Sequence, residues 1–105
     1  MFNVIGTETY LQEIARWPKD YQEMAEKVPQ QLANNPFVGD YLSYPFLREK
    51  RINEKRIYHP THKDLNLVLL VAVSGKKDQQ ATINHIKRKF DEFKIYAEKI
   101  SKQVS

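Results

Sequence analysis

Residues 47–59 read LREKRINEKRIYH and decide how the middle of the chain folds. Two strand-like runs flank Asn53-Glu54, a pair that suits a tight turn, so residues 46–52 and 55–59 are expected to form an antiparallel hairpin. Five cations lie within nine residues of it: Arg48, Lys50, Arg51, Lys55 and Arg56. Alternate residues of a strand share a face, which groups Arg48 with Lys50 and Arg51 with Glu49. Periodicity alone does not decide which face is the core.

Beyond the hairpin, Pro60 is expected to end the second strand early or to confine it to a sheet edge, because proline donates no backbone hydrogen bond. A turn at Lys63-Asp64 leads into residues 65–73, which are apolar almost throughout, as in a central strand covered on both faces. The chain then passes through residues 74–77 to an apolar pattern of helical spacing that extends from Ile83 to Ile100. This pattern predicts a long C-terminal helix. Its first half suits packing on the sheet, whereas its second half is expected to outrun the sheet and dock a partner or a second copy.

The N-terminal third predicts a strand followed by two helices. Phe2 to Ile5 form a short apolar run, and Thr7 is placed to cap the helix that follows. Trp17-Pro18 ends that helix, because the residue before a proline avoids the α region. A second helix is expected from about Lys19, and Pro29 is expected to kink or break it.

These elements predict an α+β fold in a single domain over residues 1–105. Two N-terminal helices pack on a small, mainly antiparallel sheet, in the order strand, helix, helix, three strands and a long C-terminal helix. Residues 37–44 are expected to form a connecting loop. The chain has no cysteine, which excludes disulfide scaffolds and thiol chemistry. Its longest apolar run, residues 67–73, is too short to cross a membrane, and no leader is evident, so a cytoplasmic location away from membranes is expected.

Charge is distributed unevenly along the chain. Residues 1–40 contain three basic and six acidic side chains, whereas residues 41–105 contain fourteen basic and seven acidic ones. Such asymmetry indicates a basic face for a polyanion or an acidic partner, with a solvated charged surface as the alternative.

The hairpin cations suit the binding of a phosphate. Cations that converge from paired strands can grip an anion, and arginine offers a bidentate fork. Tyr44, Phe46 and Tyr58 lie in or beside the cluster and could stack on unpaired bases. Lys76 and Lys77, after Gly75, would lie at the same end of the sheet. The alternative is a solvated hairpin whose charges protect a sheet edge from aggregation.

Other chemistry finds little support in the sequence. His59 and His62 lie near Asp64, but no further ligand is in range, so neither a metal nor another cofactor is expected. His85 on the last helix suits either a surface residue or an acid–base group. No paired carboxylates and no serine nucleophile elbow are evident, so hydrolysis by those routes has no visible machinery.

The hairpin resembles the core pattern of the RelE/ParE toxin superfamily. The resemblance lies in Leu47-Arg48-Glu49, Arg51-Ile52 and Arg56-Ile57-Tyr58. Residues 68–73, followed by Gly75-Lys76-Lys77-Asp78-Gln79, are similar to the family's last strand and its lysine-rich exit. The two N-terminal helices also match in order and position.

The resemblance implies the toxin of a type II toxin–antitoxin system. RelE-like members cut messenger RNA in the ribosomal A site without a metal, through attack of a ribose 2′-hydroxyl on the neighbouring phosphate. The expected partners are therefore the ribosome, mRNA and an acidic cognate antitoxin. Several RelE members place a tyrosine early in the C-terminal segment, to stack on the base, where this chain has Ala81-Thr82-Ile83 and His85 is the nearest polar ring.

Carried over by position, Arg51 and Arg56 match the two strand arginines and Lys77 matches the basic position after the last strand. Either Lys50 or Arg48 would deprotonate the ribose 2′-hydroxyl of the RNA. RNA contacts are expected from Lys55, Tyr58, Lys76 and His85. Two alternatives stay open, namely a ParE-like toxin that inhibits DNA gyrase and an inactive member that only binds RNA or a partner.

Overall fold

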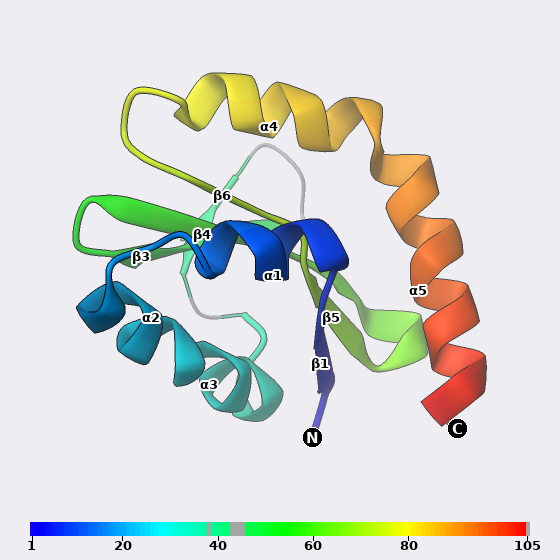
Figure 1. Cartoon of the computed structure of the whole chain (residues 1–105). Coiled ribbons are helices and arrows are strands. Elements are labelled where there is room, and N and C mark those ends of the chain that lie inside the picture. The colour runs from blue at the N-terminus through cyan, green and yellow to red at the C-terminus, as the bar shows by residue number, and fades with distance from the viewer. Residues whose placement is uncertain (38, 43–45, 105) are drawn as a thin grey trace.

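The computed structural model of the chain describes residues 1–37, 39–42 and 46–104 (Figure 1). The helices within these residues are α1 (Glu8–Ile14), α2 (Lys19–Glu26), α3 (Val28–Asn34), the 3₁₀ turn η1 (Lys63–Leu65), α4 (Gln79–Arg88) and α5 (Phe90–Val104). The strands are β1 (Asn3–Gly6), β2 (Asp40–Tyr41), β3 (Leu47–Ile52), β4 (Lys55–His62), β5 (Leu67–Leu70) and β6 (Ala72–Ser74). The α+β fold class is confirmed. In the part of the chain that is described, no helix has the length and apolar character that a bilayer crossing requires.

Local signals position the N-terminal helices as predicted. Thr7 caps α1 by accepting a hydrogen bond from the Tyr10 backbone N–H at 3.3 Å. Pro18 separates α1 from α2, and α2 ends before Lys27. Pro29 lies in the first turn of α3, where its missing N–H costs no helical hydrogen bond. The expected break at this proline is therefore confirmed.

The sheet is mainly antiparallel. Its strands follow the order β1-β5-β4-β3-β2, and β6 also pairs with β4. Only the pairing of β1 with β5 is parallel among the described strands. Leu67 and Leu69 of β5 belong to the core beneath α4 and α5, whereas Val68 and Leu70 belong to the core beneath α1–α3. The prediction of a central strand covered on both faces is thus confirmed for residues 67–70, but the single strand expected over 65–73 is interrupted at Val71, before β6.

Pro60 does not end β4 or confine it to an edge, so that prediction was wrong. The residue is fully buried and lies opposite Leu47 in the β3–β4 register. The Thr61 N–H donates to the Phe46 carbonyl oxygen, just before β3. Because successive backbone nitrogens of a strand face opposite neighbours, the Pro60 nitrogen faces away from β3, toward the neighbour formed by β5 and β6. That neighbour is interrupted at Val71, between β5 and β6. The missing donor of proline therefore faces a gap in the adjacent strand.

The C-terminal helix is present, but it is divided at Lys89 into α4 and α5. Figure 1 shows α5 turning sharply away from α4 along the edge of the molecule. The turn keeps the apolar stripe on the core: the Phe90 ring lies 4.0 Å from the Phe46 ring between centroids, and Ala97 is fully buried. The second half therefore packs on β5 and η1. The expectation that this stripe outruns the sheet was therefore wrong, whereas docking of a partner or a second copy on this helix stays a prediction.

The stretch expected to form a loop at residues 37–44 contains the short strand β2, which pairs with β3. Gly39 precedes it with φ +96°, and a Cβ at this position would collide with the Glu49 carbonyl oxygen. Glycine thus permits the approach of this segment to the hairpin. Residues 38, 43 and 44 lie outside the described residues.

Candidate active site

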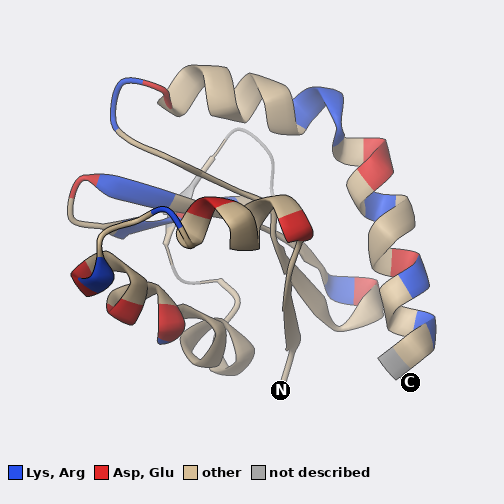
Figure 2. Cartoon of the chain, in the orientation of Figure 1, with Lys and Arg blue, Asp and Glu red and all other residues tan. Residues whose placement is uncertain are grey.

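An open pocket of about 800 Å³ lies at the tip of the β3–β4 hairpin. Its cations come from the hairpin and from the β6–α4 connection, which Figure 2 shows as basic segments at the same end of the molecule. Two carboxylates, Glu54 and Asp78, also line the pocket. Its five basic side chains are Arg51, Lys55, Arg56, Lys76 and Lys77. The excess of positive charge favours an anionic ligand.

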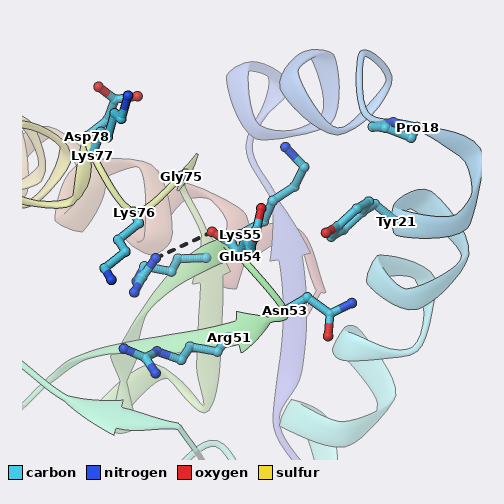
Figure 3. A pocket seen from close by; sticks show the side chains of 11 residues that line it. Pro18, Tyr21, Arg51, Asn53, Glu54, Lys55, Gly75, Lys76, Lys77 and Asp78 are labelled. Carbon is cyan, nitrogen blue, oxygen red and sulfur yellow. Dashed lines mark hydrogen bonds between the residues drawn. The ribbon is translucent and has the colours of Figure 1, made fainter.

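Strand pairing brings these cations together. Arg51 of β3 lies opposite Arg56 of β4, and Arg56 lies opposite Ser74 of β6. Neighbouring strands are about 4.8 Å apart, so Gly75 and Lys76 leave the sheet directly beside Arg56. Asn53, with φ 55°, turns the hairpin tightly enough to hold Arg51 and Arg56 in register. In Figure 3 the Lys76 side chain extends from the β6–α4 connection toward the strand that carries Arg51.

Arg56 forms the buried floor of this pocket. It is 4% exposed, and its Nε lies 3.6 Å from Oε2 of Glu49, which is 2% exposed. Gln79, at the start of α4, donates to both carboxylate oxygens of Glu49 at 3.0 Å. Arg56 Nη1 donates to Glu54 O at a weak 3.4 Å (dashed in Figure 3), and Nε has no hydrogen-bond partner among the described residues. Through this Nε, Glu49 orients a buried guanidinium that also belongs to the pocket lining, where a ligand can contact it.

No family model and no curated protein sequence matches the chain. Solved structures do. Isolated RelE toxin of Escherichia coli superposes with a TM-score of 0.65 at 13% identity, over 84% of this chain and 98% of that one. The intact E. coli RelBE toxin–antitoxin complex matches at 0.64 and 13%, over 71% and 96%. The toxin–antitoxin complex RelBE2 of Mycobacterium tuberculosis matches at 0.60 and 18%, over 71% and 91%. This chain has the RelE toxin fold.

Within the RelE fold, the structure separates Arg48 and Lys50 from the pocket at the hairpin tip. Lys50 lines a smaller hollow of about 260 Å³ on the α2–α3 side, which Arg51 also borders. The Arg48 guanidinium lies 5.9 Å from the Phe37 ring. The pair expected to deprotonate the hydroxyl is therefore on the other side of β3 from Arg56.

The expected stacking role of Tyr58 is corrected by its burial. Its side chain is 0% exposed in the RelE core, and its hydroxyl hydrogen-bonds to Ser74 Oγ at 2.9 Å. Burial raises the pKa of this hydroxyl. Phe46 is likewise used in packing, against Phe90. His85 is exposed on α4 and is not part of the pocket lining, and Tyr44 lies outside the described residues.

Three residues were not predicted to belong to this site: Tyr21 in the pocket lining, and Glu49 and Gln79, which hold Arg56 from behind it. Glu49 is an acid flanked by Arg48 and Lys50, and its alternation with Arg51 was the available signal for an ion pair on that face. Gln79 and Tyr21 carried no local signal, since they reach the site from helices 30 or more residues distant in sequence.

His59 makes the stability of this RelE-like domain dependent on pH. Its buried ring lies opposite Arg48, and burial, followed by the charges of Arg48 and Lys50, lowers its pKa from 6.5 to about 4. The folded state therefore keeps His59 neutral while the unfolded chain binds a proton below pH 6.5, so stability is full above pH 6.5 and declines as pH falls toward 4. We expect a loss of about 2 kcal/mol between pH 7 and pH 5.

Urea unfolding at pH 7 and pH 5 measures this loss. His59→Leu is expected to reduce the pH dependence, leaving a part of the same sign from buried His62, whose pKa is also lowered by burial. An unchanged difference between the two pH values in the variant would contradict the assignment.

Proposed function

We propose that this protein is the toxin of a type II toxin–antitoxin system and that it cleaves messenger RNA on the ribosome without a metal. One observation carries the proposal: a RelE fold places four cations around the buried guanidinium of Arg56, which Glu49 orients, in one open pocket. The RelE toxin of E. coli and the RelBE complexes are the proteins whose fold it shares.

The chemistry follows from the charges. The ribose 2′-hydroxyl loses its proton and attacks the adjacent phosphate, so that negative charge develops on the phosphoryl oxygens. The bond from phosphorus to the 5′-oxygen of the next nucleotide breaks, and this oxygen takes up a proton. The products are a 2′,3′-cyclic phosphate and a 5′-hydroxyl. A fixed, buried cation such as Arg56 stabilises that charge more strongly than water does. In this proposal Arg56 binds the phosphoryl group, Arg51 and Lys77 add charge around it, and Lys55 and Lys76 hold the RNA backbone.

The test is primer extension on cellular mRNA after brief induced expression. Arg51 and Lys76 are exposed, so Arg51→Ala with Lys76→Ala removes charge from the pocket with little effect on folding. The matched control, Lys63→Ala with Arg88→Ala, removes two exposed cations that do not line the pocket. We expect cuts inside translated codons from wild type and control, and about 100-fold fewer from the pocket variant.

Each other outcome favours a different function. Growth arrest without mRNA cuts, accompanied by DNA damage, would favour the ParE-like inhibition of gyrase. Neither arrest nor cuts would leave an inactive member of the fold that binds RNA or a partner. Cuts that persist in the pocket variant would remove Arg51 and Lys76 from the site.

We also propose an acidic antitoxin that covers the basic pocket. Opposite charges steer such a pair together and neutralise the site. In a purified complex, Lys76 and Lys77 should react with an amine-labelling reagent more slowly than in the free protein. Equal labelling in the two states would exclude direct masking of the pocket.

A further inference from the structure

An aromatic wall faces the cations of the pocket. Tyr21, in the first turn of α2, and Pro18, just before it, are the lining residues that come from the N-terminal helical segment. The Tyr21 ring lies edge-on to the Trp17 ring, with centroids 6.0 Å apart and planes at 74°. In Figure 3 the Tyr21 side chain points from α2 toward Lys55. Because Trp17 supports it, the Tyr21 ring is held at the pocket rather than free to rotate away.

Lys55 connects this wall to the cationic side. Its Nζ lies 5.3 Å from the centroid of Tyr21 and 5.3 Å from that of Trp17. The same lysine belongs to the hairpin that carries Arg51 and Arg56. A ligand whose ring contacts Tyr21 can therefore place a phosphate among these cations. An aromatic surface beside positive charge is what binding of an unpaired nucleotide requires.

The other aromatic side chains expected to stack are not available within the described residues. Tyr58 is buried and Phe46 packs on Phe90. Tyr21 is the one aromatic residue of the pocket lining as described. The volume, about 800 Å³, falls within the range of about 300–1,000 Å³ of pockets that enclose small ligands.

We infer that Tyr21, supported by Trp17, is a stacking platform for an unpaired RNA base whose phosphate lies on the cations of the pocket. This inference rests on the proposed function and adds to it the position of a base subsite. The platform lies on α2, on the opposite side of the hairpin tip from the Lys76–Lys77 connection.

Binding of a non-cleavable RNA tests the platform without relying on cleavage. The probe is a fluorescein-labelled, 2′-O-methylated hexaribonucleotide, titrated by anisotropy at low salt. Loss of base–aromatic stacking in Tyr21→Leu is expected to weaken binding about 5- to 100-fold, whereas Tyr21→Phe keeps the ring and should stay within about twofold. Phe37→Leu, which removes an exposed aromatic ring outside the pocket, is the matched control and should bind as wild type does.

Wild-type protein supplies a second readout that needs no variant. Trp17 is the sole tryptophan of the chain and touches Tyr21, so its fluorescence should change when the oligonucleotide binds. An abasic ribose-phosphate chain of the same length should bind wild type about as weakly as the hexamer binds Tyr21→Leu, and should leave the Trp17 signal unchanged.

The outcomes separate this inference from the proposed function. Equal affinity of wild type and Tyr21→Leu, or equal affinity for hexamer and abasic chain, overturns the platform. If mRNA cuts still depend on Arg51 and Lys76 in that case, the nuclease proposal stands without it. If Tyr21 contributes to binding but no mRNA is cut, the platform stands and the nuclease proposal fails.

Discussion

Glu49→Ala is expected to lower the free energy of unfolding by about 3–5 kcal/mol, because it leaves a buried guanidinium without its counter-charge. Arg56 and Glu49 are almost fully excluded from solvent, and their charged groups lie 3.6 Å apart. The substitution also removes the acceptor of both hydrogen bonds from Gln79. A loss of this size is a large share of the about 5–15 kcal/mol that stabilises a typical domain.

Urea unfolding followed by circular dichroism measures the loss. Glu54→Ala is the matched control, since this exposed acid lies five residues further along the hairpin and should change stability by about 0.5 kcal/mol or less. Replacing both partners, Glu49→Leu with Arg56→Met, should recover most of the stability, because it leaves no unpaired buried charge. A cost below about 1 kcal/mol for Glu49→Ala, or no recovery in the double variant, would show that the pair does not anchor the pocket floor.

The parts of the fold that were predicted correctly depend on neighbouring residues. The Thr7 cap, the breaks at Pro18 and Pro29 and the turn at Asn53 each arise from interactions a few residues apart, and the sequence displays those directly. The errors arose where contacts with a segment distant in sequence determine the course of a strand or a helix. Pro60 continues its strand where Val71 interrupts the strand beside it, and the C-terminal helix is divided at Lys89, next to the point where Phe90 packs on Phe46, a residue distant in sequence.

The positive charge of the site was predictable from the sequence, but the face of the sheet on which each hairpin cation lies was not. Period-two alternation placed Arg51 with Glu49, yet it could not assign the core face, because both faces of the hairpin are covered. Leu47 lies in the core beneath α4 and α5, and Ile52 lies in the core beneath α1–α3. Arg48 and Lys50 were therefore grouped with the site although they lie on its far side. Tyr21 enters the pocket only through tertiary packing.

Arg56→Lys is expected to reduce mRNA cleavage about 10²- to 10³-fold while leaving the fold intact. Lysine keeps the positive charge beside Glu49, so the buried ion pair persists. It does not keep the planar fork, which lets arginine pair with Glu49 and still present N–H donors to a phosphate. A single ammonium group, shared between the Glu49 carboxylate and the phosphoryl oxygens, stabilises the developing charge less than the guanidinium does. The expected fall in rate is that caused by loss of one preorganised hydrogen-bond donor.

Single-turnover cleavage of a programmed ribosome measures this effect, with urea unfolding run in parallel. Arg88→Lys makes the same substitution at an exposed position of α4 outside the pocket and should cleave at the wild-type rate. A folded Arg56→Lys variant with full activity would mean that Arg56 supplies charge alone, and that the planar guanidinium is not needed to bind the phosphate. A variant that loses activity only in proportion to its loss of stability would instead place Arg56 in the scaffold. The unchanged unfolding free energy that we expect, together with the fall in rate, assigns the guanidinium to the reacting phosphate.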